Sequence, residues 1–186
     1  KTPLQMSDLV GKGTATQGMA DFIKCCVDGK MNIIVSGGTG SGKTTTLNAV
    51  SAFLPATERI VTIEDSAELQ LLQPHVVSLE TRQANVEGKG SVSIRDLFRN
   101  ALRMIPKRVV VGECRGGESL DMIHGMSSGN AGSLTTAHAN TPKDLFARIE
   151  TMIMMAGMGL SSRMIRELIA SAVNIIMQQS RFSDGS

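Results

Sequence analysis

The sequence predicts an α/β fold in which a twisted, mostly parallel sheet is flanked by helices. Short apolar runs alternate with helical stretches of about ten to fifteen residues, an order typical of strands that are joined by helical crossovers. No internal repeat or low-complexity tract interrupts this alternation. A chain of 186 residues with 41% hydrophobic residues can bury the core of one large domain.

Composition and charge exclude several classes of protein. The 19 Lys and Arg residues exceed the 17 Asp and Glu residues by two, so we expect neither a polybasic arm nor an acidic tail. Aromatic residues make up 3% of the chain, which argues against a direct nucleic-acid partner that stacks bases. The apolar runs are too short for a membrane helix, and residues 1–10 lack a signal core, so we expect a soluble, cytoplasmic protein. The cysteines Cys25, Cys26 and Cys114 form no metal pair and are expected to be reduced, buried thiols.

The first predicted helix runs from about Thr16 to Asp28 and stops at Gly29. Its expected apolar face consists of Met19, Phe22, Ile23, Cys26 and Val27. The run MNIIVS follows, too short for a helix, and is predicted to be a buried strand that ends at Ser36. Four further apolar runs are predicted to be companion strands, at residues 59–64, 75–80, 108–113 and 133–138.

Later helices are marked by their ends. Ser93 is a candidate N-cap for a helix that Pro106 terminates, with Leu97, Phe98, Ala101, Leu102 and Ile105 as its apolar residues. Thr141 and Pro142 have the cap-then-proline order that starts a helix. The last helix is expected from about residue 162 to residue 178.

The segment GGTGSGKT at Gly37–Thr44 fits the phosphate-binding pattern GxxxxGK[ST] and lies between a predicted strand and a predicted helix. Glycines allow backbone N–H groups to form a concave nest for phosphate oxygens, and the following helix points its positive end at the same anion. The alternative is a glycine-rich turn that binds nothing, which this context disfavours. The expected nucleotide contacts are Gly37, Gly38, Thr39, Gly40, Ser41, Gly42, Lys43, Thr44 and Thr45. Lys43 would contact the β and γ phosphates, and the Thr44 hydroxyl would bind Mg²⁺.

Two acids are candidates for the reaction itself. Glu113 ends the run RVVVGE, and Glu64, followed by Asp65, ends RIVTIE, so both lie at the carboxyl ends of strands where open α/β sheets place ligands. We expect Glu113 to orient the attacking water as a base, and Glu64 to contact the metal or the water. The expected magnesium ligands are Thr44, Glu64 and Glu113. The alternative for either acid is an ordinary solvated carboxylate.

His138 ends the run SLTTAH and should also lie near the phosphates. A neutral imidazole can donate a hydrogen bond to a γ-phosphate oxygen, although a lone histidine is more often a structural hydrogen-bonding residue. No cluster of His and Cys suggests zinc.

Taken together, these motifs resemble the type II/IV secretion traffic ATPases, most closely the branch that powers Tad/Flp pilus assembly. The matching segments are GGTGSGKTTTLNA, ERIVTIEDSAELQL, PHVVSLETR, RDLFRNALRM, RVVVGECRGGESLDM and GSLTTAHANTP. The resemblance implies a RecA-like P-loop NTPase core. It assigns Glu64 and Asp65 to the family's acidic box, Glu113 to an atypical Walker B motif and His138 to the histidine box. Asn130 and Lys107 depart from the residues that are common in this branch.

The resemblance also implies what the protein does. It implies Mg²⁺-dependent ATP hydrolysis that powers pilus assembly or protein secretion across the bacterial envelope. It further implies a homo-oligomer, a hexameric ring, that docks on inner-membrane platform proteins at the cytoplasmic face of the membrane. Residues 1–15 are then expected to be the remnant of an interdomain linker, and residues 16–186 the C-terminal nucleotide-binding domain, with the family's N-terminal domain absent.

Arginines would complete the phosphate site in such a ring, and the candidates are Arg82, Arg99, Arg103 and Arg115. Two other classes of function stay open at this point. A RecA-type nucleic acid translocase uses the same loop, although the low charge and few aromatics argue against it. A nonhydrolytic nucleotide sensor is the other, in which the Met-rich segment 145–158 could be a subunit contact. Methionines at helical spacing are, however, more often ordinary core.

Overall fold

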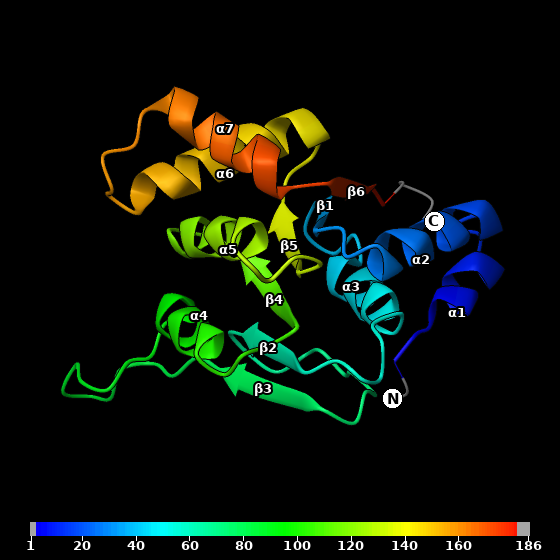
Figure 1. Ribbon diagram of the computed structural model, residues 1–186, viewed down its shortest axis with the longest axis horizontal. Helices are drawn as coiled ribbons and strands as arrows, with labels where there is room; N and C mark the ends of the chain where they lie inside the picture. The colour runs from blue at the N-terminus through cyan, green and yellow to red at the C-terminus, as the bar shows by residue number, and fades with distance from the viewer. Residues whose placement is uncertain (1–2, 182–186) are drawn as a thin grey trace.

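The computed structural model describes residues 3–181, which form one parallel sheet covered by helices on both faces (Figure 1). The strands are β1 (Ile33–Gly37), β2 (Ile60–Glu64), β3 (Val76–Glu80), β4 (Arg108–Cys114), β5 (Leu134–His138) and β6 (Ile175–Gln179). The helices are α1 (Met6–Gly11), α2 (Gln17–Asp28), α3 (Lys43–Ser51), α4 (Ile94–Leu102), α5 (Glu118–Ser127), α6 (Pro142–Met155) and α7 (Ser162–Ala172). The predicted α/β class is confirmed.

The strand order is β3-β2-β4-β5-β1-β6, and every neighbouring pair is parallel. β1, β2 and the first four residues of β4 are buried, which explains why they read as continuous apolar runs rather than as alternating ones. The five strands that were predicted from the sequence are all present, within two residues at each end. Their carboxyl ends share one edge of the sheet, where parallel α/β folds bind ligands.

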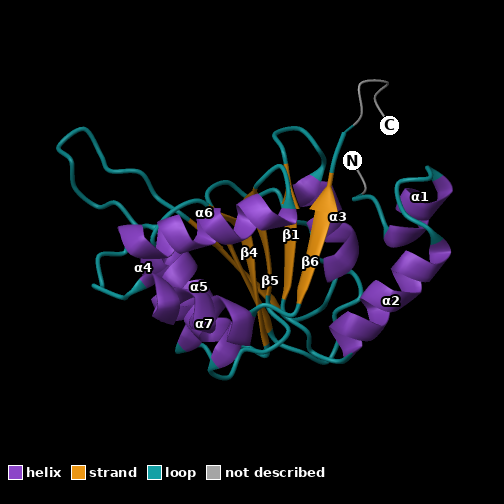
Figure 2. Cartoon of the chain, turned by 90° about the horizontal axis from the view of Figure 1, so that it is seen from above, coloured by secondary structure: helices purple, strands orange, loops and turns teal. Residues whose placement is uncertain are grey.

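The two faces of the sheet carry separate cores. Helices α4 to α7 cover one face and helices α1 to α3 cover the other (Figure 2). Alternate residues of β1 divide between them, since Ile34 packs in the first core and Ile33 and Val35 pack in the second. Helices therefore pack against both faces of the sheet, and this packing holds the ends of the strands in position.

Side-chain caps begin three of the helices, and those at Ser93 and Thr141 were predicted. The Thr16 hydroxyl accepts a hydrogen bond from the N–H of Met19 at 3.2 Å at the start of α2. Ser93 and Asp96 form a reciprocal capping box at the start of α4. Thr141 caps α6 ahead of Pro142, as predicted.

The prediction of one helix over residues 162–178 is wrong. Helix α7 ends at Ala172, and Ile175–Gln179 form the edge strand β6 beside β1. The change of structure depends on Asn32, whose side-chain amide donates to the carbonyl of Ala172 at 2.7 Å. The backbone carbonyl of Asn32 then accepts from the N–H of Ile175 at 3.1 Å and so starts the new strand.

Several expectations about burial also need correction. Met19 and Phe22 on α2 are 53% and 58% exposed, because they face a cavity rather than the core. Cys25 is exposed, whereas Cys26 and Cys114 are buried as expected. Ile105 is 79% exposed, because it lies beyond the end of α4 at a positive φ of 52°.

Most methionines of the Met-rich segment 145–158 are not ordinary core, and residues 1–15 contain a helix, while their assignment as a linker remnant stays a prediction. Met154, Met155 and Met158 of the Met-rich segment are exposed, and among its methionines only Met152 is buried. Within residues 1–15, the expected linker remnant, α1 forms and buries Met6 and Leu9 against the second core. Residues 1–2 and 182–186, which fall within the expected linker and domain, lie outside the described residues.

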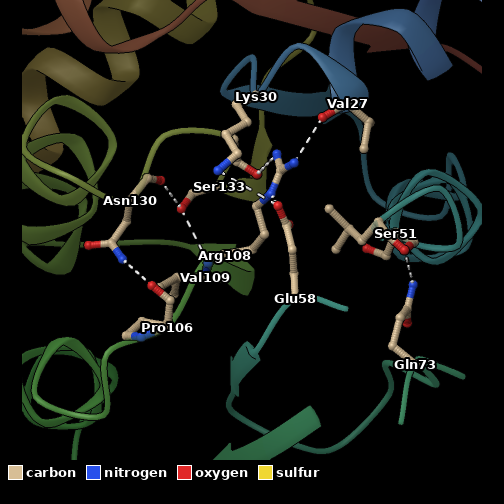
Figure 3. A network of polar contacts seen from close by, with 12 residues as sticks. Val27, Lys30, Ser51, Glu58, Gln73, Pro106, Arg108, Val109, Asn130 and Ser133 are labelled. Atoms are coloured by element: carbon tan, nitrogen blue, oxygen red, sulfur yellow. Dashed lines mark hydrogen bonds and ion pairs between the residues drawn. The ribbon is translucent and has the colours of Figure 1, made fainter. Parts of the chain in front are cut away.

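At the edge of the sheet opposite the carboxyl ends of the strands, a buried arginine forms a hydrogen-bond network (Figure 3). Arg108 at the start of β4 is 1% exposed and its Nε donates to Glu58 at 2.6 Å. Its Nη2 donates to the carbonyl of Val27 at the end of α2 and its Nη1 to the carbonyl of Gly132. This network satisfies a buried charge, which would otherwise be costly, and links helix α2 to the sheet.

Candidate nucleotide-binding site

The glycine-rich loop leaves β1 and enters α3 in the conformation that a phosphate cradle needs. Gly40 and Gly42 have φ angles of 72° and 94°, which side chains with a Cβ rarely adopt. A Cβ on Gly37 would lie 2.5 Å from the Ser41 Oγ and 2.6 Å from the carbonyl oxygen of Gln179. Ser41 and the β6 backbone therefore pack closely against the start of the loop, and only glycine fits at position 37.

Contacts within the loop hold its polar side chains. Ser41 donates to the carbonyl of Gly38 at 2.9 Å, and the Lys43 ammonium donates to the same carbonyl at 3.0 Å. Lys43 begins α3, so its charge lies beside the N-terminal end of that helix. An ammonium has three donors, and two of those of Lys43 stay available for an anion.

The edge strand β6 supports the loop from the other side. The Thr46 hydroxyl of α3 donates to the side-chain carbonyl of Gln179 at 2.7 Å. Gly37 pairs with Gln179 in the register of β1 and β6, and with His138 in the register of β1 and β5. The two strands beside β1 thus place one polar residue each at the start of the loop.

A cavity of about 500 Å³ opens in front of the loop and gathers residues from four parts of the chain. The lining residues are Thr39, Gly40, Lys43, Glu113, Arg115, His138 and Arg148. The structure therefore brings together three of the four predicted catalytic residues, namely Lys43, Glu113 and His138. Lys43, at the start of α3, shares this cavity with residues from two strand ends and from α6, an arrangement suited to binding a polyanion.

Glu113 reaches this cavity because β4 is irregular at that point. The register between β4 and β5 shifts between Val111 and Cys114, and a bulge of this kind re-aims side chains. The Thr136 hydroxyl of β5 donates to the carbonyl of Gly112 at 2.7 Å and holds the irregular segment. Gly112, which precedes Glu113, also leaves room for the side chain of Glu64. A Cβ at position 112 would lie 3.1 Å from the Cγ of Glu64.

Glu64 lies beside the cavity rather than in its lining. It is 4% exposed, and its Oε1 accepts hydrogen bonds from the N–H groups of Glu68 at 3.0 Å and Leu69 at 2.9 Å. Burial raises the pKa of the Glu64 carboxyl, and the two N–H bonds act in the opposite direction. Its role as a metal or water contact stays a prediction.

The predicted arginines are not equivalent. Only Arg115 lines the cavity, where its Nη2 and Nε contact the Glu113 carboxylate at 2.6 and 2.8 Å. Arg82 donates to the carbonyl of Gly90, and Arg99 pairs with Asp121, outside this lining. Sequence reasoning missed Arg148, ten positions beyond His138 on α6, since a single charge on a helix looks like a solvated residue. The signal that could have found it is its place on a helix that starts directly after the histidine box.

A second, mostly apolar cavity of about 260 Å³ lies on the other flank of the loop. It is bounded by α1, α2 and β6, and it reaches Thr46 and Gln179 beside the loop. Met6, Leu9, Met19, Phe22 and Met177 provide its apolar walls. This cavity explains why Met19 and Phe22 are exposed on a helix that is otherwise packed against the sheet.

The residues present fit a nucleotide phosphate with magnesium. The loop is a cradle that a Cβ at Gly37 would fill, and Thr44 stands next to Lys43 in the first turn of α3. Within residues 3–181, no group of three or more His, Cys, Asp or Glu side chains could hold a metal ion by itself. Magnesium in phosphate sites takes few protein ligands and relies on phosphate oxygens and water for the rest.

Over the same residues, 3–181, the structure contains no helix that combines the length and the apolar character of a membrane span.

Comparison with known proteins matches the chain to the family described as type II/IV secretion system protein, over residues 1–182. It is 38% identical over 176 residues to the type IV secretion system protein VirB11 of Bartonella henselae, covering 94% of this chain and 49% of that protein. It is 34% identical over 185 residues to the conjugal transfer protein TrbB of Rhizobium radiobacter, covering 98% of this chain and 54% of that protein. The chain thus spans about half the length of these curated relatives.

A similar solved structure is that of the VirB11 ATPase from the Brucella suis type IV secretion system in complex with sulphate. The TM-score is 0.81 at 32% identity, and the match covers 96% of this chain and 53% of that one. The pilus retraction motor PilT with bound ADP matches with a TM-score of 0.57 at 25% identity, over 80% of this chain and 41% of that one. These likenesses confirm the predicted RecA-like P-loop core. With a matching fold, a phosphate cradle of the expected geometry and the family's pattern over nearly its whole length, the chain belongs to the type II/IV secretion system protein family.

Proposed function

We propose that the protein is a Mg²⁺-dependent ATPase whose hydrolysis of ATP drives secretion, conjugal transfer or pilus assembly. The observation that carries the proposal is the single cavity that joins the glycine cradle and Lys43 to Glu113 and His138. A site that only bound phosphate would need the cradle alone. The acid and the histidine from neighbouring strands supply groups for chemistry at the terminal phosphate.

Each side chain in the cavity has a distinct task in this proposal. The N–H groups of the loop and the Lys43 ammonium hold the phosphate chain and offset its charge. Glu113 accepts the proton of the attacking water and orients that water in line with the bond to be broken. His138 donates a hydrogen bond to a terminal phosphate oxygen. A magnesium ion, held by Thr44 with Glu64 or Glu113, would offset further negative charge on the phosphates.

The apolar cavity on the other flank of the loop is suited to the base of the nucleotide. It adjoins α3 at Thr46, close to where the cradle would place the phosphate nearest the sugar. Apolar walls with a few polar groups are typical of cofactor and ligand sites. Thr14, Thr46, Gln178 and Gln179 are the polar residues in its lining. The helix α1, which the sequence did not predict, then forms part of the substrate site.

The wider assignment rests on the relatives. Proteins named for type IV secretion and conjugal transfer match nearly all of this chain, and the motif order resembles the Tad/Flp branch. We therefore infer a homo-oligomer, a hexameric ring, that works with inner-membrane platform proteins at the cytoplasmic face. In such a ring, residues 16–186 would be the nucleotide-binding domain and residues 1–15 the end of a linker from another domain.

The test is to measure ATP turnover and nucleotide binding of the purified protein and two variants. Lys43→Ala should weaken ATP binding at least about tenfold, because a charge on the phosphates is lost. Glu113→Gln keeps the size of the side chain and should lower turnover by about a hundredfold or more with binding retained. No turnover by the unaltered protein in the presence of Mg²⁺, or equal turnover by Glu113→Gln, would overturn the proposal. Turnover that depends on added DNA and falls steeply with salt would favour a translocase instead.

A further inference from the structure

Arg148 lines the cavity from helix α6, on the opposite face of the sheet from α3, which contributes Lys43 (Figure 2). It lies on α6, which is anchored in the core through Leu145, Ile149 and Ile153. Because these side chains are buried, the orientation of α6 is fixed. Arg148 itself is exposed and lines the same cavity as Gly40 and Lys43.

Most other arginines of this helical layer are already committed to carboxylates, and Arg148 is not. Arg163 pairs with Glu167 at 3.0 Å, and Arg166 pairs with Glu150 of α6 at 2.9 Å. Arg115 pairs with both Glu113 and Asp65. No carboxylate among the described residues lies within ion-pair distance of the Arg148 guanidinium. The cavity lining thus contains an arginine that has no carboxylate partner among the described residues.

The charges in the cavity show which ligand this cation suits. Glu113 is the carboxylate in the lining, and the Arg115 fork offsets its charge at 2.6 and 2.8 Å. Lys43 and Arg148 remain in the lining as positive charges that no ion pair among the described residues compensates. A guanidinium is always charged, and its planar fork matches two oxygens of one phosphate. An anion that extends from the loop toward the strand ends would meet both cations.

We propose that Arg148 contacts the terminal phosphate of a bound nucleoside triphosphate and so lets the site distinguish ATP from ADP. The inference rests on the proposed ATPase function and deepens it. The loop and the N-terminal end of α3 hold the phosphates nearer the sugar, and these are present in both nucleotides. Arg148 shares the cavity lining with Glu113 and His138, which act at the terminal phosphate in the proposed chemistry. Only a triphosphate has the phosphate group that these residues would contact.

The experiment compares the affinities of the purified protein for ADP and for a nonhydrolysable ATP analogue, by calorimetry in the presence of Mg²⁺. Arg148→Ala should bind the analogue about tenfold to a hundredfold more weakly, while the Kd for ADP changes by less than about threefold. Arg148→Lys keeps the positive charge but loses the planar guanidinium, so its affinity for the analogue should lie between those of the unaltered protein and Arg148→Ala. Arg163→Ala removes an exposed arginine of α7 that lies outside the cavity and should leave both affinities unchanged. Arg148 is exposed, and a thermal melt checks that each variant is folded.

The outcomes separate this inference from the proposal beneath it. If the unaltered protein binds neither nucleotide, the proposed function fails and the inference falls with it. If it binds both, and Arg148→Ala loses affinity for both equally or for neither, the inference is wrong while the function stands. Unchanged affinities together with loss of the oligomer in Arg148→Ala would assign the side chain to a subunit contact, and would likewise overturn it.

Discussion

Arg115 holds the carboxylate of Glu113 through two of its nitrogens, Nη2 at 2.6 Å and Nε at 2.8 Å, while its Nη1 contacts Asp65 at 3.4 Å. The arginine follows the acid by two positions and lies just past the end of β4. The Glu113 carboxylate raises the pKa of the Arg115 guanidinium, so this cation is permanent. Glu113 is therefore fixed in orientation by a neighbour that also lines the nucleotide cavity.

The Arg115 pair should matter for turnover and little for folding. Arg115→Ala leaves the Glu113 carboxylate free to rotate away from the attacking water, so we expect kcat to fall about tenfold. Arg115 is 63% exposed, and exposed ion pairs contribute at most about 1 kcal/mol to stability. The melting temperature should therefore change by only a few degrees. Steady-state kinetics and a thermal melt of the same preparation measure both effects.

Arg99→Ala is a matched control, since Arg99 is 58% exposed and pairs with Asp121 outside the cavity. It should leave kcat unchanged. A rise in kcat for Arg115→Ala would contradict the prediction, because it would mean that the arginine masks Glu113 rather than orienting it.

Gly37 and Gly38 should respond very differently to alanine. A Cβ at position 37 would lie 2.6 Å from the backbone oxygen of Gln179, and backbone in a strand cannot move aside. We expect Gly37→Ala to distort the cradle and weaken ATP binding more than about tenfold. At position 38 the nearest atom is the Asn140 Oδ1 at 3.8 Å, an ordinary contact, so Gly38→Ala should bind ATP within about threefold of the unaltered protein. Equal affinities for the two variants, measured by calorimetry, would show that β6 does not constrain the loop.

Local chemistry explains which parts of the molecule could be predicted from the sequence. The loop at Gly37–Thr44, the caps at Ser93 and Thr141 and the buried strands all depend on residues that are neighbours in the chain. The acid at the end of β4 and His138 at the end of β5 were placed correctly, because parallel strands end at one edge. These features need no information about distant contacts.

What could not be predicted depends on contacts between distant residues. The apolar run 175–177 continues the helical pattern of α7, and the contact that ends the helix comes from Asn32, 140 positions earlier. The bulge that aims Glu113 depends on the register between two strands. Arg148 gains its place only when α6 packs over the sheet, and the helix α1 is held by a core that other elements create.

Burial of Glu64 predicts a pH dependence of stability. Its pKa is raised in the folded protein, so the native state binds the proton more tightly than the unfolded chain does. The free energy of unfolding should then decrease as the pH rises from the unfolded pKa through the folded one, and level off above it. Glu64→Gln has no proton to lose, so its stability relative to the unaltered protein should increase across about pH 4 to 7.

Urea unfolding at several pH values measures this difference. Glu87→Gln is the control, because the Glu87 side chain is 70% exposed and this variant shows the effect of removing a carboxylate outside the core. Parallel stability curves for the unaltered protein and Glu64→Gln would count against the raised pKa.

Asn32 is buried at 4% exposure with all four hydrogen bonds of its amide made, so its replacement should be costly. Its Nδ2 donates to the carbonyls of Ala172 and Met126, and its Oδ1 accepts from the N–H groups of Gly132 and Ser133. Asn32→Asp retains the acceptor and loses both donors, which leaves a buried charge facing two carbonyl oxygens. We expect a loss of about 3 kcal/mol in urea unfolding, with faster hydrogen exchange in β6. Asn85→Asp is the same substitution at an exposed turn where the Oδ1 only accepts, so it should be neutral within about 0.5 kcal/mol. A similar loss of unfolding free energy in both variants would mean that the Asn32 donors do not stabilise the junction between α7 and β6. The edge strand β6 would then be held by its pairing with β1 alone.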